Sequence, residues 1–218
     1  MTNHNAPLNR VVKINVESPA QDEWVEIIPE HKQNVLQSAS CSNSKLMVTS
    51  YLENASERMK IFNFDSPAKH LKDIDLPGYG AIPLSSGGHD DAEIFFKFSQ
   101  FTDPGSTFRL DMNSFQLEAI RRTKLTDLKL NLTDFTTDQV WYESRDGTKV
   151  PMFLIRKKSV LGSLDEKPKS PIPTILYGYG GFNNAETPSF NLMNLIFLNN
   201  LNGLYVVANI RGGGEFGK

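Results

Sequence analysis

Residues 92–98 read Ala-Glu-Ile-Phe-Phe-Lys-Phe, in which Ile94, Phe96 and Phe98 occupy every second position. This two-residue period is typical of a β-strand with one buried face. An earlier stretch, Lys-Leu-Met-Val-Thr-Ser-Tyr-Leu at residues 45–52, is similarly rich in β-forming residues. The two stretches start 47 residues apart (45 to 92), which indicates a repeated β unit.

Each unit contains four predicted strands: residues 35–39, 45–52, 58–64 and 71–76 in the first, and 80–84, 92–98, 107–112 and 117–120 in the second. Polar loops are expected at residues 53–57 and 102–106. Corresponding strands lie about 45 to 49 residues apart (35 to 80, 58 to 107), and this period with four strands is that of a β-propeller blade. The alternative is a β-sandwich whose strands happen to have this spacing.

The opening segment fits the second half of a preceding blade. Residues 9–16 match the third strand and residues 23–28 the fourth. Residues 1–126 are therefore predicted to form a partial β-propeller of about two and a half four-stranded blades.

The pattern changes in residues 127–218, where an α/β arrangement is predicted. Residues 139–144 and 149–155 flank Asp146-Gly147, a strong hairpin turn signal, and a polar surface loop is expected at residues 157–173. A continuous apolar strand (172–177), a helix (191–200) and a second, fully buried strand (204–210) then follow in βαβ order. This order is typical of a parallel sheet with helices covering its faces.

A glycine-rich turn, Tyr177-Gly178-Tyr179-Gly180-Gly181-Phe182, comes directly after the apolar run Thr174-Ile175-Leu176. In α/β hydrolases the loop after an early strand donates one arm of the oxyanion hole. A tyrosine hydroxyl can serve there, because its pKa of about 10 keeps the proton in place at neutral pH. The other interpretation is that both tyrosines are ordinary aromatics at a strand end.

A second glycine run, Arg211-Gly212-Gly213-Gly214-Glu215, follows the last predicted strand. It matches neither the dinucleotide-binding nor the Walker A spacing, so we expect a tight turn in which Arg211 anchors neighbouring loops. No Gly-x-Ser-x-Gly occurs, so no triad residue is predicted in residues 1–218. The four histidines all lie before residue 127 without metal-ligand spacing, and neither a metal nor a cofactor is expected.

Composition narrows the functional class further. A net charge of −2 gives no electrostatic case for nucleic acid, and no apolar run approaches the ~20 residues of a membrane span. The first ten residues lack the apolar core of a signal peptide, and the single cysteine, Cys41, fits a reducing compartment. A cytoplasmic location is expected.

Three glycine-bearing stretches, residues 146–153, 176–183 and 207–217, resemble in sequence and order those of the prolyl oligopeptidase family of serine peptidases. The resemblance extends over nearly the whole chain. It implies a seven-bladed propeller capping an α/β-hydrolase domain, whose Ser-Asp-His triad cleaves short peptides on the carboxyl side of proline. Residues 127–218 would then be the incomplete start of the hydrolase sheet.

The resemblance also assigns individual residues. Tyr179 matches the tyrosine whose hydroxyl helps to form the oxyanion hole, and Phe182 matches an aromatic residue that lines the substrate pocket. The family implies a monomer and short proline-containing peptides as substrates. Since no triad member has a counterpart, the chain by itself is predicted to be inactive.

Two other functions stay open. One is a non-catalytic interaction fragment that uses the blades as a binding platform. The other is part of a different propeller-capped serine hydrolase, such as an oligopeptidase B-like or acylaminoacyl-peptidase-like enzyme. The Tyr177 to Phe182 loop favours the proline-specific family over this last group.

Overall fold

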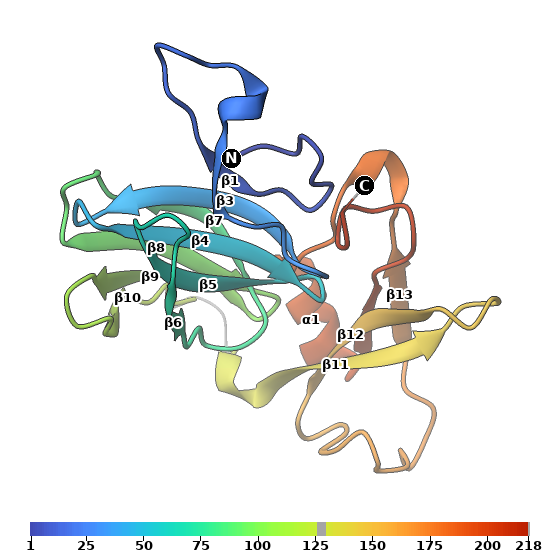
Figure 1. Ribbon diagram of the computed structural model, residues 1–218. Coiled ribbons are helices and arrows are strands. Elements are labelled where there is room, and N and C mark those ends of the chain that lie inside the picture. The colour runs from blue at the N-terminus through green and yellow to red at the C-terminus, as the bar shows by residue number, and fades with distance from the viewer. Residues whose placement is uncertain (126–129, 218) are drawn as a thin grey trace.

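The structure is a computed structural model that describes residues 1–125 and 130–217. Figure 1 shows three β layers stacked against one another, with a further sheet beside them. The first layer is an antiparallel hairpin of β1 (Val11–Lys13) and β2 (Val25–Ile28). The strand predicted at residues 9–16 is thus shorter than expected, because Ile14 and Val16 lie in an exposed loop.

The next two layers are the predicted blades. Strands β3 (Val35–Ser42), β4 (Leu46–Glu53), β5 (Ser56–Asn63) and β6 (His70–Ile74) form one antiparallel sheet in chain order. The same arrangement recurs in β7 (Ala81–Ser86), β8 (Glu93–Gln100), β9 (Asp103–Asp111) and β10 (Leu117–Arg121). The prediction of two four-stranded blades preceded by a partial one is confirmed.

Both predicted polar loops are shorter than expected. Between β4 and β5 only Asn54 and Ala55 form the turn, both with positive φ, as a two-residue hairpin turn requires. The loop predicted at residues 102–106 is mostly part of β9, although Pro104 and Gly105 read as turn residues. A shift in strand register accommodates them, with Gly105 at φ +119°.

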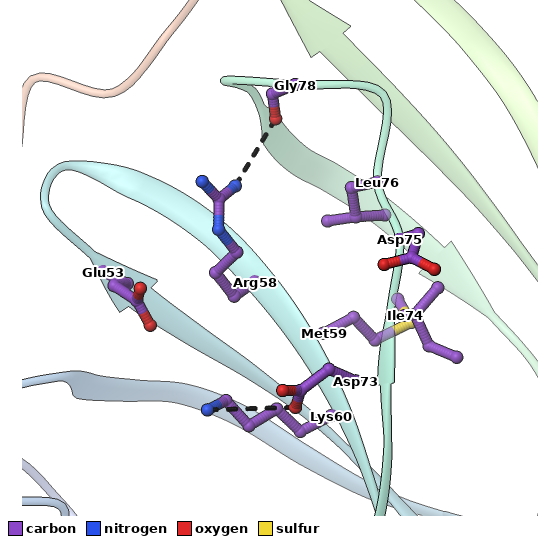
Figure 2. Close-up of a pocket in the computed structure, with 9 residues that line it drawn as sticks. All are labelled: Glu53, Arg58, Met59, Lys60, Asp73, Ile74, Asp75, Leu76 and Gly78. Atoms are coloured by element: carbon purple, nitrogen blue, oxygen red, sulfur yellow. Dashed lines mark hydrogen bonds and ion pairs between the residues drawn. The ribbon is translucent and has the colours of Figure 1, made fainter. Parts of the chain in front are cut away.

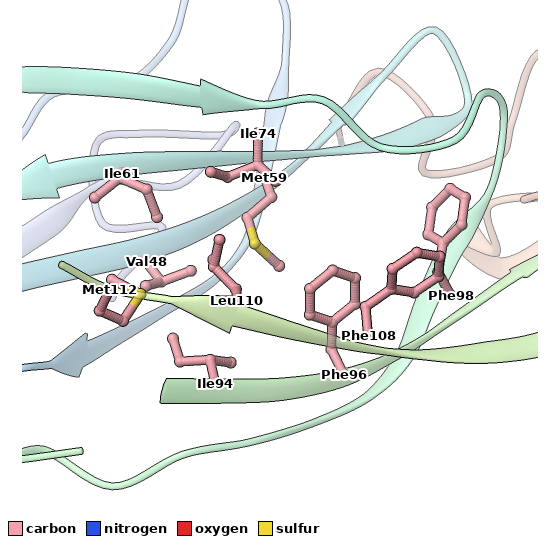
Figure 3. Packing of buried hydrophobic residues seen from close by; sticks show 10 residues of the cluster. All are labelled: Val48, Met59, Ile61, Ile74, Ile94, Phe96, Phe98, Phe108, Leu110 and Met112. Carbon is pink, nitrogen blue, oxygen red and sulfur yellow. The ribbon is translucent and has the colours of Figure 1, made fainter. Parts of the chain in front are cut away.

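The two blades pack through alternating side chains (Figure 3). On β8, Ile94, Phe96 and Phe98 point into the layer between the blades. The Phe96 and Phe108 rings stack there with centroids 5.6 Å apart. The complete buried cluster comprises Val48, Met59, Ile61, Ile74, Ile94, Phe96, Phe98, Phe108, Leu110 and Met112. Neither blade could bury this apolar surface alone, which makes the two blades one stability unit.

The remaining sheet has the order β11-β12-β14-β13. Strands β11 (Phe135–Glu143) and β12 (Lys149–Lys157) form the predicted hairpin around Asp146-Gly147. Strands β13 (Thr174–Gly178) and β14 (Leu204–Ala208) are parallel, while β12 pairs with β14 in the antiparallel sense. The predicted parallel pair is therefore present, but it belongs to a mixed sheet.

Helix α1 (Leu192–Asn200) connects the parallel strands, close to the predicted bounds. Its N-cap side chain, Asn191, accepts a hydrogen bond from the Met193 amide at 2.9 Å. Leu195 and Leu198 are fully buried against the sheet. No helix in residues 1–125 and 130–217 is long and apolar enough to cross a membrane.

The expectation that residues 172–177 form a covered strand is wrong. Strand β13 lies at the edge of the sheet, and all five of its residues are exposed, Leu176 by 68%. By contrast Val206, Val207 and Ala208 of the neighbouring β14 are buried. A run of apolar residues predicts a strand, but it does not predict whether that strand lies at the centre or the edge.

The blades contact the mixed sheet through the β4–β5 and β8–β9 turns and through the connection between the two blades. The Phe153 ring of β12 meets the rings of Tyr79 and Phe101, with centroids 5.4 and 5.3 Å away. Beside them, the buried Ala55 packs into the same cluster, and Gln139 donates a hydrogen bond to the Asn54 carbonyl at 2.6 Å. The domain boundary predicted between residues 126 and 127 lies outside the described residues.

Candidate functional site

The glycine-rich turn follows the carboxyl end of β13, as the sequence predicted. Tyr179 is the first residue after the strand and is half-buried. Its ring lies over Gly181, where an added Cβ would be 2.7 Å from the hydroxyl oxygen and 2.9 Å from Cζ. Among the described residues this hydroxyl has no hydrogen-bond partner, so its proton is available to an acceptor from elsewhere.

Phe182 is 94% exposed and has φ 55° and ψ 30°, in the left-handed region. Asn183 follows with φ 59°. Two adjacent non-glycine residues in this region cost about 1–2 kcal/mol each, so the surrounding structure must hold them. The turn thus presents a large apolar ring to the exterior in a strained conformation.

The two glycine-rich turns interlock at the end of the sheet. A Cβ added to Gly212, whose φ is +103°, would lie less than 3.0 Å from the Gly180 carbonyl oxygen. Similarly, Cβ atoms on Gly213 and Gly214 would lie 2.6 Å from the carbonyl oxygens of Asn184 and Asn183. The glycines are therefore needed so that two backbones can approach closely, and no phosphate site has to be invoked.

This close approach predicts the outcome of a substitution. Gly212→Ala should lower the free energy of unfolding by more than Gly147→Ala, because Gly147 also has a positive φ (+78°) but its added Cβ meets nothing within 4 Å. Backbone strain alone costs about 1–2 kcal/mol, and the clash adds to it only at Gly212. Urea denaturation of both variants measures the difference, and equal losses would contradict the interlocked turns.

Arg211 anchors this turn to the β11–β12 hairpin, as predicted. Its guanidinium donates to the Asp146 carboxylate at 2.5 Å. This hydrogen bond, with a second one from the Thr148 amide, lowers the pKa of Asp146 to about 2. Both side chains are exposed (61% and 54%), so the pair mainly holds the two loops together and adds little to the free energy of unfolding.

The pKa of Asp146 offers a direct test of this contact. In Arg211→Ala the pKa should rise from about 2 towards the ordinary value of about 3.9. Since the folded-state pKa is depressed, the small stabilisation from this pair is present above the ordinary pKa and disappears as the pH falls towards 2. A carboxyl NMR titration measures the shift. Arg145→Ala is the control and should leave the Asp146 titration unchanged.

Sequence reasoning missed a polar cluster beneath the two turns. The Tyr177 hydroxyl donates weakly to the Glu186 carboxylate at 3.5 Å, and the charge of Glu186 raises the pKa of Tyr177. Burial, followed by the nearby charge of Glu215, raises the pKa of Glu186. Tyr177 and Tyr179 thus differ: the first hydroxyl is engaged, while the second is not.

A separate hollow of about 300 Å³ lies at β5 and β6 of the first blade (Figure 2). The two basic side chains that line this hollow already have partners. Arg58 donates to the Gly78 carbonyl at 3.4 Å, and Lys60 pairs with Asp73 at 3.9 Å. These contacts tie the outer strand and the connection to the next blade in place. We assign this hollow a structural role.

Comparison with known proteins identifies the lineage of this fold. The sequence model of a family described as "Prolyl oligopeptidase, N-terminal beta-propeller domain" matches residues 1–123. The chain belongs to the prolyl oligopeptidase family. Prolyl endopeptidase of Dictyostelium discoideum is 38% identical over 227 aligned positions, which cover 100% of this chain and 28% of that protein. The dual function macrocyclase-peptidase POPB of Amanita bisporigera is 36% identical, with 99% and 28% covered.

Solved structures of the prolyl oligopeptidase family have the same fold. A prolyl endopeptidase structure superimposes with a TM-score of 0.84 at 33% identity, covering 99% of this chain and 30% of that one. Prolyl oligopeptidase B of Galerina marginata, bound to a 35mer hydrolysis and macrocyclization substrate, gives 0.84 at 32% identity, with 99% and 29% covered. The chain therefore spans less than a third of the length of these relatives.

Proposed function

We propose that this chain is part of a proline-specific serine endopeptidase that hydrolyses short peptides on the carboxyl side of proline. Family membership supports the reaction class, and the relatives include proteins named prolyl endopeptidases. Residues 1–218 contain no Gly-x-Ser-x-Gly, so the nucleophile must come from polypeptide outside them. By themselves these residues should not react with a serine-directed phosphonate.

The mixed sheet is, in this proposal, the start of an α/β-hydrolase domain comprising residues 127–218, and residues 1–126 are the end of the propeller. The parallel β13–β14 pair with α1 between its strands is the arrangement that such a domain repeats. The exposed strand β13 supports the idea that the sheet continues past this edge. The hydrolase assignment rests on these features together.

Tyr179 is proposed to donate one hydrogen bond to the carbonyl oxygen as it becomes negatively charged during acyl transfer. The main support is that the Tyr179 hydroxyl has no hydrogen-bond partner among the described residues. It lies on a turn that close backbone contacts at glycines hold in place. Such a donor lowers the barrier because it strengthens its hydrogen bond as charge develops in the transition state. A donor fixed in advance needs no rearrangement at the moment of reaction.

Phe182 is proposed to line the substrate pocket beside the reacting bond. An exposed aromatic ring on a strained turn is costly unless a ligand or another part of the protein covers it. A proline ring is a compact apolar group that packs well on an aromatic face. The further proposals are a cytoplasmic location, which the single cysteine favours, and a monomeric enzyme.

The substrate class can be tested in the full-length peptidase that contains this chain. We expect fluorogenic peptides with proline before the cleaved bond to be hydrolysed far faster than matched peptides with arginine or with an N-acetylated alanine there. Preference for arginine would instead indicate an oligopeptidase B-like enzyme, and preference for the acetylated residue an acylaminoacyl-peptidase-like one. Absence of hydrolysis and of phosphonate labelling would favour the interaction fragment.

A further inference from the structure

Glu215 is a carboxylate that is only 2% exposed, at the end of the second glycine-rich turn. Its Oε1 accepts hydrogen bonds from the Glu186 amide at 2.9 Å and from the Asn209 side-chain amide at 3.2 Å. The Asn209 amide also donates to the Glu186 carbonyl at 2.6 Å. The Glu215 and Asn209 side chains thus hold both backbone polar groups of one residue, Glu186.

Burying a carboxylate costs several kcal/mol, roughly, before any compensation, so its position calls for an explanation. A neutral apolar side chain could fill the same space, but it could not hold the Glu186 backbone. A Cβ added to Gly213 would lie less than 3.0 Å from the Glu215 carboxylate, so the carboxylate also lies close against this turn. These contacts are suited to holding the geometry of a loop.

Glu186 ends the loop of residues 179–186, which contains the candidate site residues Tyr179 and Phe182. Glu186 lies four residues after Phe182, and Phe182 and Asn183 adopt the left-handed region. Such a conformation persists only where the surrounding structure fixes it at both ends. Strand β13 fixes the start of the segment. The hydrogen bonds that Glu215 and Asn209 make with the Glu186 backbone fix its end.

We propose that Glu215 is a positioning residue: it holds the Glu186 backbone and thereby keeps residues 179–186 in the conformation that presents the Tyr179 hydroxyl and the Phe182 ring. Glu215 does not touch substrate in this scheme. The proposal rests on the proposed function for its kinetic consequence. Its structural consequence, the loop conformation, is independent of that function.

The structural consequence is tested in the 218-residue chain with 4-fluorophenylalanine at position 182. In Glu215→Ala the fluorine signal should move towards its value in a short peptide, and exchange of the Glu186 amide should accelerate at least about tenfold. Glu215→Gln keeps an acceptor oxygen and should restore both. Glu186→Ala is the matched control. It removes the side chain but keeps the backbone hydrogen bonds to Glu215 and Asn209, so the fluorine signal should not move.

Amides of β8 report whether a variant still folds. If the β8 amides lose their protection from exchange in Glu215→Ala, Asn209→Ala is tested in its place, because it removes the hydrogen bond to the Glu186 carbonyl. An unchanged fluorine signal and a protected Glu186 amide in whichever variant folds would overturn the proposal.

The kinetic consequence is tested in the full-length peptidase. Glu215→Ala should lower kcat at least about tenfold with a smaller change in KM, Glu215→Gln should recover most of it, and adding Tyr179→Phe should cause little further loss. A slow Tyr179→Phe enzyme with an unimpaired Glu215→Ala enzyme would overturn the positioning role alone. If Tyr179→Phe itself has normal activity, the proposed role of Tyr179 fails, and if the parent enzyme hydrolyses no proline-containing peptide, the proposed function fails. In both cases the fluorine result still decides whether Glu215 holds the loop.

Discussion

In the full-length peptidase, Tyr179→Phe is expected to lower kcat by about 10²–10³-fold, equivalent to about 2.7–4 kcal/mol of barrier. The substitution keeps the ring and its packing on Gly181 and removes only the hydroxyl. Because the hydroxyl would act mainly on the transition state, KM should stay nearly unchanged. Steady-state kinetics on a proline-containing fluorogenic peptide measure both constants.

Tyr177→Phe is the matched control. It likewise removes a tyrosine hydroxyl, but one that contacts the Glu186 carboxylate. Its activity should remain close to that of the parent enzyme. Equal losses in the two variants would indicate a general disturbance of the turn, and an unimpaired Tyr179→Phe enzyme would remove Tyr179 from the mechanism.

Phe153→Ala is expected to cause the largest loss of stability, about 3–5 kcal/mol, which is the typical cost of replacing a buried phenylalanine by alanine. Phe153 is completely buried and meets Tyr79 and Phe101 at the junction between blades and mixed sheet. Since whole domains are stable by only about 5–15 kcal/mol, the two parts should then unfold separately.

The two tryptophans allow this separation to be observed. Trp24 precedes β2 in the opening hairpin, and Trp141 lies in β11 of the mixed sheet. Urea unfolding of single-tryptophan versions should give coincident transitions in the parent and an earlier Trp141 transition with Phe153→Ala. Phe64→Ala, at a residue that is 46% exposed, should change little. Coincident, unshifted transitions with Phe153→Ala would contradict the junction.

Much of the blade architecture could be predicted from sequence because each strand carries its own signal. Alternation in residues 92–98 indicated β8, and a second β-rich run at residues 45–52 indicated that the unit repeats. The loops were harder. Pro104 and Gly105 read as a turn, yet they form part of β9, because the irregular pairing with β8 accommodates them. Such a bulge depends on the neighbouring strand, which a local reading does not include.

The candidate site was only partly predictable for the same reason. The Tyr177 to Phe182 motif identified the turn, and Arg211 was expected to anchor a neighbouring loop. The roles of Glu186, Asn209 and Glu215 depend on contacts between segments up to 29 residues apart in sequence. A glutamate after three glycines reads as exposed, and only the fold shows that it is buried.

In the proposed function, the turn after β13 supports acyl transfer at a carbonyl carbon. The most direct test is a crystal structure of the full-length peptidase with a proline-containing peptide aldehyde bound as a tetrahedral adduct. We predict the Tyr179 hydroxyl oxygen within about 2.7–3.1 Å of the adduct oxygen, with the Phe182 ring beside the proline. An adduct oxygen bound only by other donors, with the Tyr179 ring turned away, would contradict this account.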